Sequence, residues 1–164
     1  MKIHTLLLAI FCLGVAQAQA PTEVKFVHLS AEHLKGYAEK LKAREPTELQ
    51  GKKNMIANEH FELHDNFSFY EVRRDEDGLP EQHARWHDIF IVQQGSGAVL
   101  YGGKAEGIQP GNAPGEGMGG KMVGGHMQRL VAGDMAIIPA GIPHQVNPDK
   151  GKSITYMVLK VEKK

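Results

Sequence analysis

The chain has 164 residues, with 19 basic and 19 acidic side chains and therefore no formal net charge. This length predicts a single domain whose core is large enough to be stable by packing alone. The balanced charge argues against a nucleic-acid partner, because binding nucleic acid requires a clustered excess of basic residues.

Residues 1–18 have the pattern of a signal peptide. A basic residue near the start is followed by an apolar run, Leu6 to Val15, which is too short to span a bilayer. The next three residues, Ala-Gln-Ala, fit a small-x-small cleavage site, so we expect cleavage after Ala18. The mature chain is therefore expected in the periplasm or in the medium.

The only cysteine, Cys12, lies inside this peptide. The mature chain would then contain no thiol, which excludes disulfides and thiol chemistry. A lipid-attachment cysteine is also missing from the cleavage site, so we expect no membrane anchor.

Residues 19–65 are predicted to form a helix and a strand that leads into the main domain. The hydroxyl of Ser30 can accept a hydrogen bond from the first turn of a helix, and Pro46 bounds the segment. Between them, apolar side chains recur at helical spacing: Leu34, Tyr37, Ala38 and Leu41. We expect this amphipathic helix to pack on the outside of the domain.

Residues 66–164 are predicted to form an all-β domain. In the first strand the side chains alternate, with Phe67, Phe69 and Glu71 on one face and Ser68, Tyr70 and Val72 on the other. Later stretches are rich in strand-forming residues: 88–94, 135–138 and 153–161. Residues 94–103 are predicted to form a glycine-containing turn and a return strand. Many short strands separated by turns indicate a sandwich or a barrel.

The segment from Gly102 to Gly125 does not fit this pattern, because 10 of its 24 residues are glycine. It has little apolar surface to offset the entropy of ordering. We therefore predict a long, mobile surface loop between two strands. Such a loop can be a lid or a plain insertion, and the sequence does not separate the two.

Four side chains have the composition of a metal site. Glu81 and His83 are two residues apart in a predicted strand, so their side chains share a face. Asp88 begins the next apolar strand, and His144 lies near the start of a later one. Oxygen and nitrogen ligands without a thiolate suit Mn, Fe, Ni or Zn. As alternatives, the histidines could be hydrogen-bonded core residues and the carboxylates could lie at the rim.

The spacing of these residues resembles the two motifs of the cupin superfamily. The second motif matches closely: Gly133, five residues, Pro139-x-Gly141, two residues and His144. Its final asparagine, Asn147, comes one residue earlier than in the family pattern.

The first cupin motif matches mainly in spacing. Glu81 stands where the family has its first histidine, His83 takes the place of the second, and Asp88 takes the place of the glutamate. Six residues then lead to Gly95, while Asp75 occupies the place of the leading glycine. The chain is similar to a group of small exported single-domain cupins whose first motif is E-x-H.

The resemblance implies a fold and a ligand set. The implied fold is a double-stranded β-helix, a jelly-roll-like barrel, with the N-terminal helix packed outside it. The implied ligands of a divalent metal (Mn, Fe, Zn or Ni) are Glu81, His83, Asp88 and His144. A glutamate in place of a histidine adds oxygen character, which favours Mn or Fe. Asp88 could instead orient a ligating histidine, and His87 is a rival ligand.

Two functions remain open at this point. One is a metal-dependent enzyme that acts on a small polar organic molecule, with Glu81 as an available general base. The other is a non-catalytic module that binds a small ligand or a metal. We expect four residues to line the substrate cavity: Arg74, Phe90, Tyr101 and Tyr156. Either Arg73 or Arg74 could reach an anionic substrate, with a plain surface arginine as the alternative. The resemblance also suggests a homodimer, which the sequence itself does not indicate.

Overall fold

The computed structural model describes residues 26–45, 47–49, 52–54 and 56–164. The predicted signal peptide with its cleavage site, and Pro46, lie outside the described residues. Within the described part of the chain, no helix is long and apolar enough to cross a membrane.

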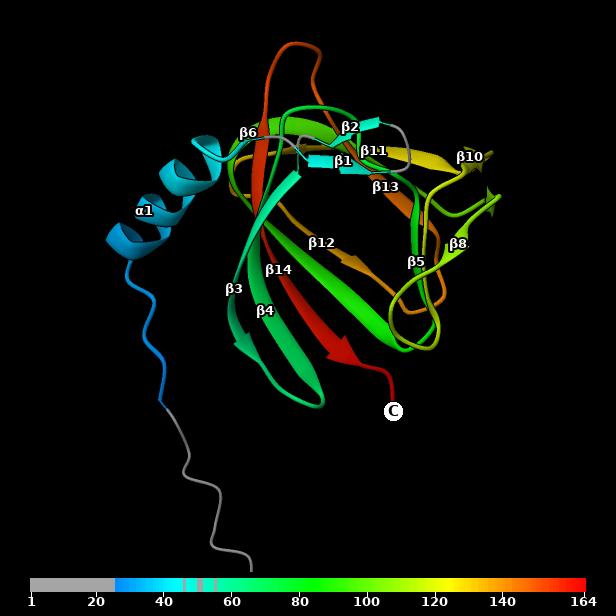
Figure 1. The fold of residues 1–164 in the computed structure, drawn as a ribbon, viewed down its shortest axis with the longest axis horizontal. Helices are drawn as coiled ribbons and strands as arrows, with labels where there is room; N and C mark the ends of the chain where they lie inside the picture. Colours follow the sequence, from blue (N-terminus) through cyan, green and yellow to red (C-terminus); the bar gives the residue numbers. More distant parts are fainter. Residues whose placement is uncertain (1–25, 46, 50–51, 55) are drawn as a thin grey trace, which may run out of the picture.

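One helix, α1 (Ala31–Lys42), lies beside β3 (Ile56–Leu63) and β4 (Phe67–Arg74), on the outside of the barrel (Figure 1). Ser30 caps it, since its hydroxyl accepts a hydrogen bond of 3.2 Å from the backbone N–H of His33. Ala38 and Leu41 are buried. The predicted cap and the predicted outer position of the helix are both confirmed.

The remaining elements are strands. In chain order they are β1 (Thr47–Leu49), β2 (Lys52–Asn54), β3 and β4 as above, β5 (Glu81–His83), β6 (Trp86–Tyr101), β7 (Lys104–Glu106), β8 (Gln109–Pro110), β9 (Glu116–Met118), β10 (Lys121–Val123), β11 (His126–Val131), β12 (Met135–Ile138), β13 (His144–Pro148) and β14 (Ile154–Glu162). The main sheet has the order β3-β4-β14-β6-β13-β5-β9-β8, and β11 and β12 also pair with β6. This sheet curls into a barrel (Figure 1).

The long strand β6 joins the two halves of the barrel. Its first part, up to Gly95, pairs with β14, and residues 88–91 also pair with β12. Its last part, from residue 96, pairs with β11 and β13. The predicted turn and return strand at residues 94–103 were therefore wrong. The chain bends at Gly95 and continues in the same strand, because new partners take over the backbone hydrogen bonds after the bend.

The strands place alternate side chains inside the barrel, as predicted for β4. Tyr70 and Val72 face the interior. Phe69 lies on the outer face, where its ring centroid is 5.9 Å from that of Phe61. The ring of Phe61 in turn packs against Tyr37 of α1. The apolar core comprises Val72, Phe90, Val92, Val99, Leu130, Ile138, Val146, Ile154, Tyr156 and Val158.

The glycine-rich segment, residues 102–125, contains four short strands, β7 to β10. The prediction that this segment is a long surface loop between two strands was therefore wrong, because the segment contains strands of its own. β9 pairs with β5, with Glu116 opposite His83, and β10 pairs with β7. Tight glycine turns allow these short strands to pair. For example, Gly120 has φ 70°, and a Cβ there would lie 2.0 Å from the backbone oxygen of Glu106. The segment therefore forms part of the wall beside β5.

Gly95→Ala tests the importance of the bend in β6. Gly95 has φ 77°, and an added Cβ would lie 1.9 Å from the backbone oxygen of Ser153. We expect a loss of roughly 3 kcal/mol in the free energy of unfolding, from backbone strain plus the clash. Gly133→Ala is the matched control, because Gly133 has φ 93° with nothing within 4 Å, so only a loss of about 1 kcal/mol is expected. Equal losses in urea denaturation would contradict this account.

Glu71 gives the stability a specific dependence on pH. It is only 1% exposed, and neither carboxylate oxygen has a hydrogen-bond partner in the described structure. Burial raises its pKa to about 7. The unfolded chain releases this proton at lower pH, near 4.5. Stability should therefore fall as the pH rises from about 4.5 to about 7.

Glu71→Gln should remove this dependence. We expect the variant to gain roughly 1 to 3 kcal/mol over the parent at pH 8 and little at pH 4.5, measured by urea denaturation. The exposed Glu76→Gln is the control, with no such change expected. An equal effect of Glu71→Gln at both pH values would contradict the assignment.

Candidate metal site

The four predicted ligands come from three strands that meet inside the barrel. Glu81 and His83 lie on β5, Asp88 on β6, and His144 on β13 directly opposite Glu81. The ligand atoms of Glu81, His83 and His144 all lie within 4.8 Å of one another. The structure thus brings together residues that are more than sixty positions apart in the sequence.

The two imidazoles point the same nitrogen toward the cavity. The Nδ1 of His144 lies 3.1 Å from the backbone oxygen of Ile142, and the Nδ1 of His83 lies 2.5 Å from Glu116 Oε2. These contacts assign the proton to Nδ1 in both rings. The two Nε2 atoms are buried and have no hydrogen-bond partner in the described structure. Paired, oriented and unpartnered nitrogens are what a metal centre requires.

Asp88 lies next to the Nε2 atoms of both rings. Its Oδ2 is 3.3 Å from the Nε2 of His83 and 3.3 Å from the Nε2 of His144, and its Oδ1 is 3.0 Å from Lys160 Nζ. A carboxylate that orients a ligating histidine would contact Nδ1, and Glu116 holds that place on His83. The position of Asp88 therefore suits a metal ligand better than an orienting group.

Glu81 is clamped by Arg74. Arg74 donates a hydrogen bond of 2.6 Å from Nη2 to Glu81 Oε1 and one of 2.8 Å from Nε to the hydroxyl of Tyr156. Burial alone would raise the pKa of Glu81, but its contact with His83 and the charge of Arg74 lower it to about 2. Glu81 is thus ionised, with Oε2 facing His83 Nε2 at 3.6 Å.

The charges of the cluster favour a cation between its members. Burial would lower the pKa of His83, but the neighbouring carboxylates of Asp88 and Glu81 raise it to about 9. The raised pKa means that His83 tends to hold a second proton, so the carboxylates around it favour positive charge at this place. Two imidazole nitrogens with carboxylate oxygens and no thiolate fit Mn, Fe, Zn or Ni.

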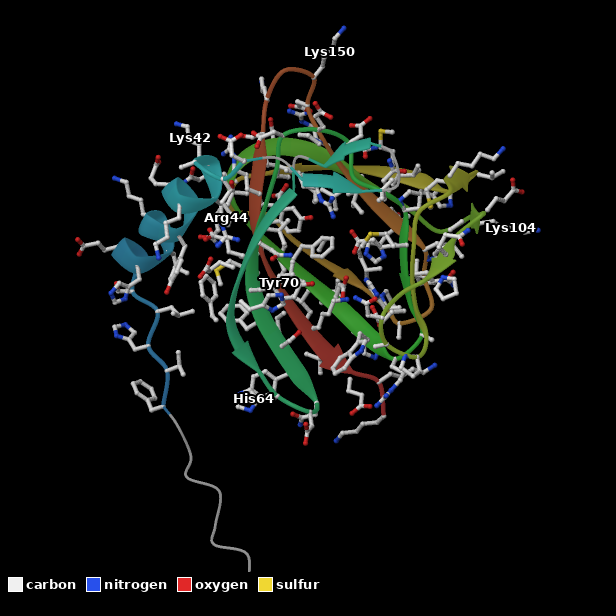
Figure 2. The ribbon with its side chains drawn as sticks, in the orientation of Figure 1. Lys42, Arg44, His64, Tyr70, Lys104 and Lys150 are labelled. Atoms are coloured by element: carbon white, nitrogen blue, oxygen red, sulfur yellow. The ribbon has the colours of Figure 1, made fainter. Side chains whose placement is uncertain are left out.

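Two of the predicted lining residues, Phe90 and Tyr156, lie together in the wall of the cavity, with ring centroids 5.0 Å apart. The cavity has a volume of about 230 Å³ and is also lined by Arg74 and all four predicted ligands. Tyr70, labelled in Figure 2, points into the same interior.

The prediction for Tyr101 was wrong. It is 38% exposed, and it lines a separate groove of about 680 Å³ with His126 and residues of β12. The reason is its position as the last residue of β6, where its ring lies beside that of His126. The rival ligand His87 also lies outside the cluster, because its Nδ1 accepts a hydrogen bond from the backbone N–H of Ala140.

Sequence reasoning missed several residues of the cavity, among them Glu116 and Met118 from β9 and Lys160 from β14. Alternation along β14 could have identified Lys160, because it shares a face with Tyr156. Glu116 had no such signal, since the pairing of β9 with β5 is not visible in a glycine-rich sequence.

Comparison with known proteins gives the fold. No protein-family model and no curated protein matches the chain. The structure is similar to the cupin domain of Cnp3 from Schizosaccharomyces pombe, with a TM-score of 0.50 and 10% identity over 68% of this chain and 67% of that chain. It is also similar to a cupin 2 conserved barrel domain protein from Rhodopseudomonas palustris, with a TM-score of 0.49 and 16% identity over 71% of this chain and 68% of that chain. For KdgF from Halomonas sp. the TM-score is 0.46, with 21% identity over 66% of this chain and 82% of that chain.

The match to the Cnp3 domain shows that the chain has the cupin fold. The predicted all-β barrel with one outer helix is therefore confirmed. At such low identity a shared fold carries no information on the reaction, because one fold hosts many functions.

Glu116→Ala tests the orientation of His83. Removing the carboxylate on Nδ1 frees the ring to rotate and to change tautomer, so we expect Mn²⁺ affinity to fall by about 10- to 100-fold. Glu106→Ala in the same segment is the control, since Glu106 is exposed on β7 and pairs with Lys121. Calorimetric titration with Mn²⁺ measures both variants. An unchanged affinity in Glu116→Ala would rule out this role.

Proposed function

We propose that the chain is an exported cupin that binds one divalent metal ion through Glu81, His83, Asp88 and His144. We further propose that it is a metal-dependent enzyme acting on a small polar organic molecule. The observation that carries the proposal is the pair of buried Nε2 atoms, which have no hydrogen-bond partner in the described structure and lie close to the carboxylates of Asp88 and Glu81 inside the barrel.

A bound divalent ion would supply Lewis acidity in this cavity. The side chains of the barrel would hold and orient the small molecule around it. The cavity volume of about 230 Å³ is below the range of about 300 to 1,000 Å³ typical of sites for drug-sized ligands. Phe90 and Val158 supply apolar walls, while Tyr70 and Tyr156 supply hydroxyls. A molecule of a few carbon atoms fits this description.

Glu81 is a poor general base in this arrangement. Its ion pair with Arg74 is short, and a pKa of about 2 leaves the carboxylate little affinity for a proton at neutral pH. The role of Glu81 is then to bind the metal, and the earlier hypothesis that it abstracts a proton is not retained.

One observation favours the alternative of a non-catalytic binding module. Each of the three carboxylates that line the cavity already has a basic partner: Glu81 has Arg74, Asp88 has Lys160, and Glu116 has His83. Such pairing leaves none of these carboxylates free to transfer protons. Turnover would then have to rely on the metal without a protein base. A chain without turnover would be a binding protein.

Export and dimerisation are further parts of the proposal. Export rests on the pattern of residues 1–18 alone. Dimerisation rests on the resemblance to cupins alone.

His144→Ala tests the metal centre. We expect the purified parent chain to hold close to one Mn or Fe per chain by elemental analysis, and the variant to lose most of it, because one imidazole ligand is removed. His87→Ala is the matched control, since that ring accepts a hydrogen bond from the backbone N–H of Ala140 and lies outside the cavity lining. Metal content unchanged in His144→Ala would refute the proposed centre. A metal-free parent that still binds a small ligand would favour the binding module.

A further inference from the structure

We propose that the small molecule taken by this cavity carries a carboxylate, and that Lys160 binds this anionic group. The proposal rests on the proposed function, which places a metal ion beside the same cavity, and it adds the chemical class of the ligand. It is carried by the position and the unused hydrogen-bonding capacity of one lysine.

Lys160 is a buried cation inside the barrel. It lies on β14 directly opposite Asp88 on β6, and its side chain is only 14% exposed. Nζ forms an ion pair with Asp88 Oδ1 at 3.0 Å, but it has no hydrogen-bond partner in the described structure. An ammonium group carries three N–H donors. Leaving them unused in a buried place is costly, so a ligand that accepts them would be stabilised.

Arg74, the other cation of the cavity, is not available for this purpose. Two of its nitrogens donate to Glu81 and to Tyr156. The third, Nη1, has no hydrogen-bond partner in the described structure, but it is packed against Gly78, where an added Cβ would lie 2.6 Å away from it. Arg74 is thus enclosed as a clamp on Glu81. We therefore assign the contact with an anionic ligand to Lys160, in place of the predicted Arg74.

The charge of the whole cavity agrees with an anionic ligand. Its lining contains two cationic side chains, Arg74 and Lys160, and three anionic ones, Glu81, Asp88 and Glu116. With neutral histidines and a divalent ion, the cavity would carry a net charge of about plus one. A single carboxylate neutralises this charge, whereas a neutral ligand leaves it buried.

Lys160→Met provides the test, because it keeps most of the aliphatic stem and removes the charge. We would load the full mature chain with Mn²⁺ and titrate it calorimetrically with glycolate, pyruvate, malonate and succinate. The neutral amides of the same acids serve as paired probes. Lys160→Gln replaces Lys160→Met if the latter does not fold, and Lys160→Arg keeps the charge. Lys150→Met is the matched control, since Lys150 lies exposed on the turn before β14, far from the cavity (Figure 2).

We expect the parent chain and Lys150→Met to bind at least one of the carboxylates about tenfold or more tightly than its amide. Lys160→Met should lose this preference while it still binds Mn²⁺, which elemental analysis of the same sample checks. Folded Lys160→Arg should keep the preference. The proposal is overturned if no carboxylate binds the parent, if amides bind equally well, if folded Lys160→Met keeps the preference, or if folded Lys160→Arg loses it.

Failure of the metal centre would be seen separately. If the parent retains no Mn²⁺, the proposed function fails on elemental analysis alone. The same titrations of the metal-free chain then decide the anion proposal, because the Lys160 ammonium is present with or without the metal. A carboxylate preference that depends on Lys160 would support it in that state as well, and its absence would overturn it.

Discussion

The pairing of one bent strand with both halves of the barrel is the constraint on which the rest of the structure depends. Before its bend, β6 holds β14 and β12; after it, β6 holds β13 and β11. β13 in turn pairs with β5. Asp88, Lys160, His144 and His83 are thereby fixed around one cavity by backbone hydrogen bonds rather than by loops. Sites built on strands in this way hold their geometry well.

The interior that results is unusual in its charge. A small barrel encloses three carboxylates, a guanidinium, an ammonium and two imidazoles close to an apolar core. Isolated charges would be costly there, and pairing keeps them in place. The pairs differ in geometry, however. Arg74 donates hydrogen bonds to both Glu81 and Tyr156, whereas Lys160 forms an ion pair with Asp88 but no hydrogen bond in the described structure. The first arrangement shapes the site, and the second leaves capacity for a ligand.

Local patterns in the sequence were sufficient to predict several parts of the structure. The cap at Ser30, the strand at Met135–Ile138 and the shared face of Glu81 and His83 each follow from a short stretch of residues. The convergence of His144 with them is not a local property, and it was expected only because the motif spacing resembles that of a known fold.

The errors arose where non-local pairing decided the conformation. Gly95 resembles a turn residue, but the strands on either side of it have partners that straighten the chain into one bent strand. Glycines 102–125 resemble a loop, yet β9 is fixed by β5, which brings Glu116 to His83. Tyr101 was misplaced because it is the last residue of β6, where the pairing of β11 brings His126 beside it.

The clamp on Glu81 restricts how this lineage can change. The usual histidine at position 81 would remove the partner of a buried guanidinium, and a side chain at Gly78 would collide with that same guanidinium. Arg74, Gly78 and Glu81 should therefore be inherited or exchanged as a group. Exchanging Glu81 alone would leave the buried guanidinium without its carboxylate, at a cost of roughly 3 to 5 kcal/mol.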